Sequence, residues 1–150
     1  MTTLAADKVR VSHYAGDPVR EEYPVIASDI IYRGACVGEN GSGYSRPLTA
    51  GDPFQGFAVA KADNASGAAG DKAVTVDQKG FITLPISSLA ITANDRALVY
   101  ASDDDTFTLT ATNNTLIGTV SRWVSTGFAL VEFDAMWAKG VAAALAAAAA

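Results

Sequence analysis

Apolar and polar residues alternate along much of the chain between Ile30 and Asp134, as in the stretch Thr-Phe-Thr-Leu-Thr at 106–110. A two-residue period is typical of a β-strand that buries one face. Clusters of Gly, Asn, Asp and Pro separate the alternating stretches, and these residues favour chain reversal. The pattern predicts short strands at 30–37, 53–61, 73–77, 81–85, 97–101, 106–112, 116–124 and 128–133.

Helical periodicity is missing between these predicted strands, and strands at such spacing are typical of sandwiches and barrels. We therefore predict an all-β fold, a small barrel or a jelly-roll-like sandwich, over residues 29–134. Residues 1–28 form a predicted extended N-terminal arm, in which Pro18 and Pro24 interrupt any long helix. Within this arm, residues 8–14 alternate enough to pair as an edge strand.

The last residues, 135–150, are rich in alanine, which is the best helix former. They predict a short helix at 136–145, weakened at Gly140, and a frayed tail at 146–150. Trp137, Val141 and Leu145 are spaced by four, so they would lie along one face of this helix. We predict that this face docks on a neighbouring subunit, chiefly through Met136 and Trp137.

The charge balance bears on the choice of partner. Net charge is −5, and the basic residues of the core, such as Lys61, Lys72, Lys79 and Arg96, are scattered along the sequence. Nucleic-acid binding needs clustered basic side chains, so this balance argues against a nucleic-acid partner. The first residues lack a continuous apolar block, and the alanine run is too short for a bilayer. We expect a soluble protein without a membrane partner, made in a cytoplasm.

Few side chains are suited to catalysis or metal binding. Cys36 is the only cysteine, which excludes an intrachain disulfide, and its apolar neighbours predict a buried residue. His13 is the only histidine, so a triad or zinc site has no second histidine to recruit. The glycine-rich stretch 38–45 lacks the lysine of a phosphate-binding loop, and the three aspartates at 103–105 lack the spacing of a calcium loop. We predict no enzyme activity, no cofactor and no metal site.

Several segments, taken in order, resemble the capsid cement proteins of tailed phages, also called head decoration proteins. These segments are Tyr-Arg-Gly-Ala-Cys-Val at 32–37, the Ala-Gly-Asp and Gly-Phe-Ala elements within 44–58, the strand–turn–strand unit 73–84, and the late strands 98–103, 117–120 and 129–133. The arm and the alanine tail lie outside the resemblance. It implies a structural protein on the exterior of the virion, bound to the major capsid protein of an icosahedral head, without catalytic residues or a cofactor.

A cement protein stabilises the assembled lattice because it binds the lattice better than it binds free subunits. Capsid lattices offer local three-fold and two-fold axes, so we expect a homo-oligomer, with a trimer preferred to a dimer. An extended arm can add a strand to a partner's sheet edge, and tryptophan is enriched at binding hot spots. The predicted partner contacts are Val9, Val11, His13, Tyr14, Val25, Ile26 and Trp137.

Two other functions remain open. Aromatic residues near turns, Tyr44 and Phe54, would suit a receptor- or glycan-binding β module of a virion. The stretch 29–34 is similar to a strand motif of trimeric dUTP-hydrolysing enzymes, but the Pro-Arg-Ser-Gly nucleotide element of that family is missing. The nucleotide hydrolase is therefore the weaker alternative.

Overall fold

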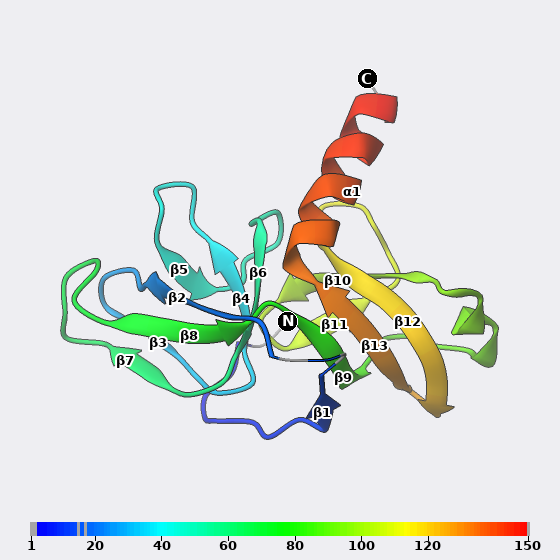
Figure 1. Cartoon of the computed structure of the whole chain (residues 1–150), viewed down its shortest axis with the longest axis horizontal. Coiled ribbons are helices and arrows are strands. Elements are labelled where there is room, and N and C mark those ends of the chain that lie inside the picture. Colours follow the sequence, from blue (N-terminus) through cyan, green and yellow to red (C-terminus); the bar gives the residue numbers. More distant parts are fainter. Residues whose placement is uncertain (1–2, 15, 17, 150) are drawn as a thin grey trace.

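The computed structural model describes residues 3–14, 16 and 18–149, which form three antiparallel sheets and one α-helix (Figure 1). The fold is all-β and sandwich-like with a C-terminal helix, as the alternation predicts. The six-stranded sheet has the order β1-β9-β13-β12-β10-β11. Its strands are β1 Ser12–His13, β9 Lys79–Pro85, β13 Phe128–Asp134, β12 Thr115–Ser125, β10 Leu98–Asp103 and β11 Thr106–Thr108.

A five-stranded sheet has the order β2-β8-β6-β4-β5, with β2 Arg20–Pro24, β8 Ala73–Asp77, β6 Phe54–Ala58, β4 Cys36–Glu39 and β5 Ser45–Pro47. A separate pair contains β3 Asp29–Ile31 and β7 Ala62–Asn64, and a 3-10 helix, η1 Ile91–Asp95, precedes β10. Only Gln78 separates β8 from β9, so the chain passes directly from the five-stranded to the six-stranded sheet, as the green strands in Figure 1 show.

The strands differ from the sequence prediction in places where the sequence is not alternating. The predicted strand 30–37 is two strands, β3 and β4, because the chain turns between them at Gly34, whose φ is +86°. The short strands β5 and β7 were not predicted, and neither was β2. Strand β2 is charged and mostly exposed, so its sequence carries no burial signal.

The main core lies between the inner faces of the two large sheets. Phe57 from the five-stranded sheet packs edge-on against Phe133 from the six-stranded sheet, with ring centroids 4.9 Å apart. Cys36 and Leu48 join the same cluster opposite Val120 and other buried residues of the six-stranded sheet. The alternating positions of β9 and β13 supply this core, which explains the two-residue period of the sequence.

A second, smaller core covers the other face of the five-stranded sheet. It contains Val25, Ile31 and Val37 together with Val74 and Val76 of β8. Strand β2 pairs with β8 over its whole length, from Arg20↔Asp77 to Pro24↔Ala73. The predicted arm of residues 1–28 is therefore too long: its last part belongs to this sheet and its core.

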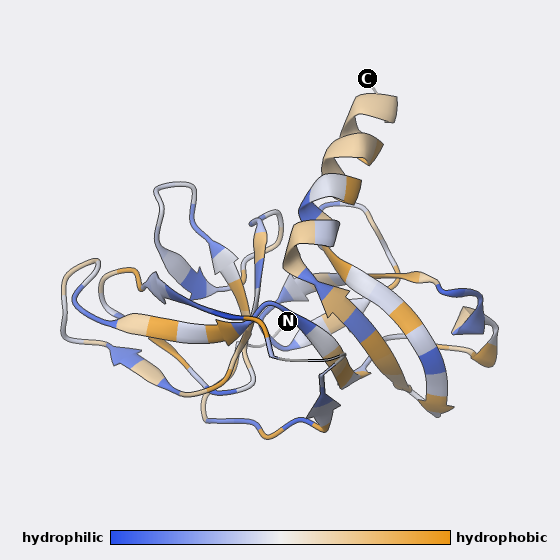
Figure 2. Cartoon of the chain, in the orientation of Figure 1, coloured by the Kyte–Doolittle hydropathy of each residue, from blue (hydrophilic) through white to orange (hydrophobic). Residues whose placement is uncertain are grey.

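The C-terminal helix α1, Ala135–Ala149, follows β13 directly. The carboxylate of Asp134 accepts the backbone N–H of Trp137 at 3.1 Å, which is the hydrogen bond of an N-cap. Ala135 and Ala138 are buried, whereas residues 142–149 are exposed and project from the body as an apolar rod (Figures 1 and 2). The prediction of a frayed tail is wrong for 146–149, since the high helix propensity of alanine maintains the helix there, and residue 150 lies outside the described residues. Within the described part of the chain, no helix has the length and apolar character needed to cross a membrane.

Candidate docking surface of the arm and the six-stranded sheet

Residues 3–14, called the arm from here on, cross the junction between the two large sheets. The backbone N–H of Lys8 donates to the carbonyl of Arg33, and the N–H of Thr83 donates to the carbonyl of Val11, both at 2.8 Å. Further along, Ser12 and His13 form β1 and pair with the edge strand β9. The predicted edge strand is thus confirmed for Ser12–His13, and its partner is the chain's own sheet.

Two glycines make room for the arm. A Cβ atom on Gly34 would lie 2.1 Å from the carbonyl oxygen of Lys8, far inside any real contact. A Cβ atom on Gly80 would lie 3.0 Å from the carbonyl oxygen of His13. The rest of the chain, called the body from here on, therefore has no side chain at these two points of close approach. This allows the backbone of the arm to pack directly against the backbone of the body, in a groove called the track.

The inward-pointing side chain of Arg10 holds the arm against the rest of the protein. This side chain is only 4% exposed, and its guanidinium donates to the carbonyl of Gly34 and to the carboxylate of Asp105, both at 2.8 Å. The guanidinium carbon also lies 5.3 Å from the ring centroid of Phe107 and 6.0 Å from that of Phe57. A buried guanidinium that is both paired and stacked on aromatic rings holds a single geometry.

Asp105 is the body's main anchor for the arm. It also accepts the ammonium of Lys8 at 2.9 Å, so two cations of the arm meet one carboxylate. Burial alone would raise the pKa of Asp105, but hydrogen bonds from Lys8 and Arg10 outweigh burial and lower this pKa below its ordinary value. The neighbouring carboxylate of Asp104 accepts the N–H of Leu4, yet burial raises its pKa. The arm is therefore held chiefly by the ionised form of Asp105.

The side chains of the arm point in the opposite directions to those usual for a surface strand. Its charged residues Lys8 and Arg10 face the body, whereas Val9 and Val11 are 76% and 74% exposed. A strand on a protein surface normally turns its apolar residues inward. Here the inward contacts are ionic, and the apolar side chains are displayed to the outside on a fixed backbone.

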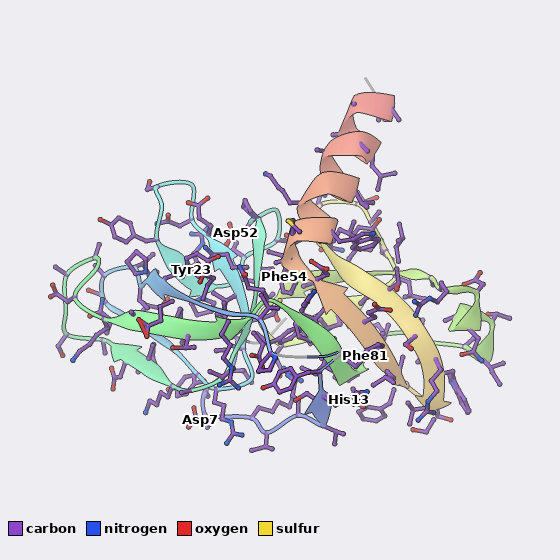
Figure 3. All side chains as sticks on the ribbon, viewed as in Figure 1. Asp7, His13, Tyr23, Asp52, Phe54 and Phe81 are labelled. Atoms are coloured by element: carbon purple, nitrogen blue, oxygen red, sulfur yellow. The ribbon has the colours of Figure 1, made fainter. Side chains whose placement is uncertain are left out.

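The outer face of the six-stranded sheet continues this apolar display. His13 stacks on Phe81 with centroids 5.0 Å apart, and the two are seen side by side in Figure 3. Beside the hydrogen bond between Thr83 and Val11, Thr83 pairs with Leu130 on β13. Four of the eight outward positions on β9 and β13 carry half-buried or exposed apolar side chains, namely Phe81, Pro85, Phe128 and Leu130. The other four are polar or charged, namely Lys79, Thr83, Glu132 and Asp134. We call this surface, with Val9 and Val11, the docking face.

The remaining predicted contacts in the first part of the chain lie elsewhere. The hydroxyl of Tyr14 accepts from Arg20 at 2.6 Å and donates to Asp77, which ties the end of the arm to the five-stranded sheet. Val25 is fully buried in the second core, so the prediction that it contacts a partner is wrong in this conformation. Val25 directly follows β2, and its backbone N–H donates to the carbonyl of Lys72 beside β8, which holds its side chain in the second core. Ile26 packs partly against that core and is half-buried, so its predicted contact stays a prediction.

Trp137 lies apart from the arm, at the root of α1. Its side chain is 37% exposed, and its neighbour Met136 is 84% exposed. Val141 packs partly on the main core, and Leu145, next on the same helical stripe, is 47% exposed. The structure therefore brings Val9, Val11 and His13 together on the docking face and places Trp137 just beyond the end of β13, a central strand of the same sheet.

Other candidate chemical groups are occupied by structural contacts. Burial raises the pKa of the Cys36 thiol well above its ordinary value, so this residue is the small buried side chain that the sequence predicts. In the glycine-rich hairpin, the carboxylate of Glu39 accepts the N–H groups of Gly41 and Gly43 at 2.5 and 2.7 Å. These amides, which a phosphate would need, are satisfied from within the chain. Phe54 is buried in the main core, so the prediction that it is exposed for glycan binding is wrong.

The anchors Arg10, Gly34 and Asp105 were not predicted from the sequence. The alternation Lys-Val-Arg-Val at 8–11 contained the signal, but it does not say which set of side chains faces inward. Among the described residues, no group of three or more His, Cys, Asp and Glu side chains is arranged to hold a metal ion. Comparison with family models, curated proteins and solved structures finds no match for this chain.

Proposed function

We propose that this protein is a capsid decoration protein, which binds the exterior of an icosahedral phage head and stabilises the lattice of the major capsid protein. The observation that carries the proposal is the docking face: apolar side chains displayed outward on an arm whose cations are fixed inward. Contiguous exposed apolar side chains on a folded domain mark interaction sites. The ordered resemblance of the central segments to cement proteins supplies the identity of the partner.

The physical requirements of a cement protein fit this face. Docked on a rigid track, the arm loses little conformational freedom on binding, and pre-organisation of this kind raises affinity. Each docking contact is small, but several copies acting on one lattice multiply their effect through effective concentration. The outcome is stabilisation of the assembled shell by mass action. A trimer is the expected oligomer on a local three-fold axis.

The binding experiment compares variants on purified shells that lack the protein. Val9→Thr/Val11→Thr keeps β-branched side chains but makes the outward surface polar. Val19→Thr is the matched control, because Val19 is also an exposed valine but is not part of the docking face. It directly precedes β2, where its carbonyl accepts the backbone N–H of Gln78. We expect the double variant to lose co-sedimentation with shells and the control to retain it. Equal binding by both variants would remove the docking face from the proposal.

A receptor- or glycan-binding module is the second candidate, since the half-exposed Trp137 offers an aromatic surface in place of Phe54. It predicts binding to host surfaces by the isolated protein and no dependence of shell stability on its presence. Shells that rupture at the same temperature with and without the protein would favour this alternative.

A further inference from the structure

A hollow of about 240 Å³ opens at the root of α1. It is lined by Arg96, Thr119, Glu132, Asp134 and Trp137. Thr119 and Glu132 are directly paired across β12 and β13, and Asp134 lies two residues further along β13, so all three side chains share the outer face of the sheet. A cavity of about 150 Å³ is enough to hold a benzene ring, so this hollow has room for a planar group with its stem.

The hollow is lined by more negatively charged groups than positively charged ones. Glu132 and Asp134 supply two carboxylates, and Arg96 supplies one guanidinium, which donates to Glu132 at 2.8 Å. One oxygen of Asp134 accepts the N–H of Trp137 in the helix cap. Lys79 is the cross-strand partner of Asp134 but does not line the hollow. The lining therefore carries one net negative charge beside an indole.

We propose that this hollow receives the cationic end of a lysine or arginine side chain from the protein on which the docking face lies. A cation over a tryptophan ring is attracted by the ring's negative face, and a nearby carboxylate adds a charge-assisted hydrogen bond. The hollow and the docking face share the outer side of one sheet, so one partner surface can reach both. This inference rests on the proposed function for the source of the cation, while the chemistry of the hollow is tested on the isolated protein.

Two substitutions change the charge of the hollow in opposite directions with little effect on the backbone. Asp134→Asn removes a negative charge, and asparagine is as good an N-cap as aspartate. Arg96→Asn removes the positive charge, and asparagine tolerates the left-handed conformation that Arg96 adopts at φ 67°. A cation site should therefore be weakened by the first change and strengthened by the second. A purely structural role predicts no such pair of opposite effects.

The test is a titration of the protein with N-acetyl-arginine amide, read by the NMR signal of the Trp137 indole N–H. The neutral isostere N-acetyl-citrulline amide is the matched ligand control. Trp123→Phe leaves Trp137 as the only tryptophan, so it assigns the signal and permits a parallel fluorescence titration. An isolated side chain at an exposed site should bind weakly, with a Kd on the order of 10 mM. We expect saturable binding of the arginine ligand alone, about fivefold weaker in Asp134→Asn and about fivefold tighter in Arg96→Asn.

Each other result overturns the inference. Equal binding of the arginine and citrulline ligands would show a neutral site, and weaker binding of the arginine ligand in Arg96→Asn would show that the net negative charge of the lining does not hold the cation. No shift of the Trp137 signal up to about 100 mM ligand would show that the hollow binds neither the arginine nor the citrulline ligand. These outcomes are independent of shell binding: a protein that binds shells but not arginine refutes this inference alone. A protein that binds arginine but no shell refutes the proposed function and leaves the cation site.

Discussion

Replacing Arg10 with alanine should release the arm without unfolding the body. The guanidinium of Arg10 is 4% exposed, and it contacts Asp105, the carbonyl of Gly34 and the rings of Phe57 and Phe107. Removing one partner of a buried ion pair costs about 3–5 kcal/mol. Asp105 keeps Lys8 as a partner and is 18% exposed, so we take the lower limit, about 3 kcal/mol. The arm contributes little to either core, so local opening relieves this cost before global unfolding does.

Hydrogen exchange measures this opening directly. The N–H of Thr83, which donates to the carbonyl of Val11, should lose about 150-fold in protection, the factor that corresponds to 3 kcal/mol. The N–H of Val120, which donates to Ala97 in the body, should exchange as in the unmodified protein. Arg20→Gln is the control, because its ion pair with Asp77 is 48% exposed on the arginine side and should contribute little.

Two results would refute this reasoning. Unchanged protection at Thr83 in Arg10→Ala would mean that the ionic contacts do not hold the arm. A uniform loss of protection across the body would mean that Arg10 is part of the global fold and that the arm is not a separate unit. In either case, the outward display of Val9 and Val11 would need another explanation.

Further predictions concern the same track and face. Gly34→Ala should displace the arm as strongly as Arg10→Ala, because its Cβ would collide with Lys8, and limited proteolysis within residues 3–14 would detect this. Acid should also release the arm. The lowered pKa of Asp105 means that its stabilisation is complete above its ordinary value near 3.8 and is lost as pH falls through the lower folded value. The protection factor of the Thr83 N–H, which corrects for the intrinsic pH dependence of exchange, should fall over that range, and an Asp105→Asn protein should show no such fall. Val9→Thr/Val11→Thr should weaken the binding of one protein copy to the shell by about 30-fold. About three quarters of each valine remains to be buried on docking, and the apolar burial lost by the two substitutions together is worth roughly 2 kcal/mol. A titration on shells with less than a threefold difference would contradict this value.

The sequence predicts the body of this fold well because the body obeys a simple rule. Along β9 and β13 every second side chain is buried, so hydrophobic alternation alone identifies the strands. Strand β2 escapes the rule because it lies at an edge with its charged residues exposed. Its assignment depends on hydrogen bonds to β8, which no local pattern encodes.

The sequence predicts only some residues of the proposed docking face, for a physical reason. Exposed valines at 9 and 11 follow from the sequence of the arm once its inward side is known. That side is decided by Asp105 and by the missing side chain of Gly34, which are distant in sequence. For Val25 the sequence is misleading. An apolar residue in a polar segment predicts a partner contact, but the side chain of Val25 is buried in the chain's own second core.

Image reconstruction of an intact particle that carries this protein tests the central claim most directly. The account predicts density for it on the outer surface of the shell, with Val9 and Val11 of the arm packed against the major capsid protein. Density showing those valines in solvent, with the protein attached through another surface or absent from the shell, would contradict the account.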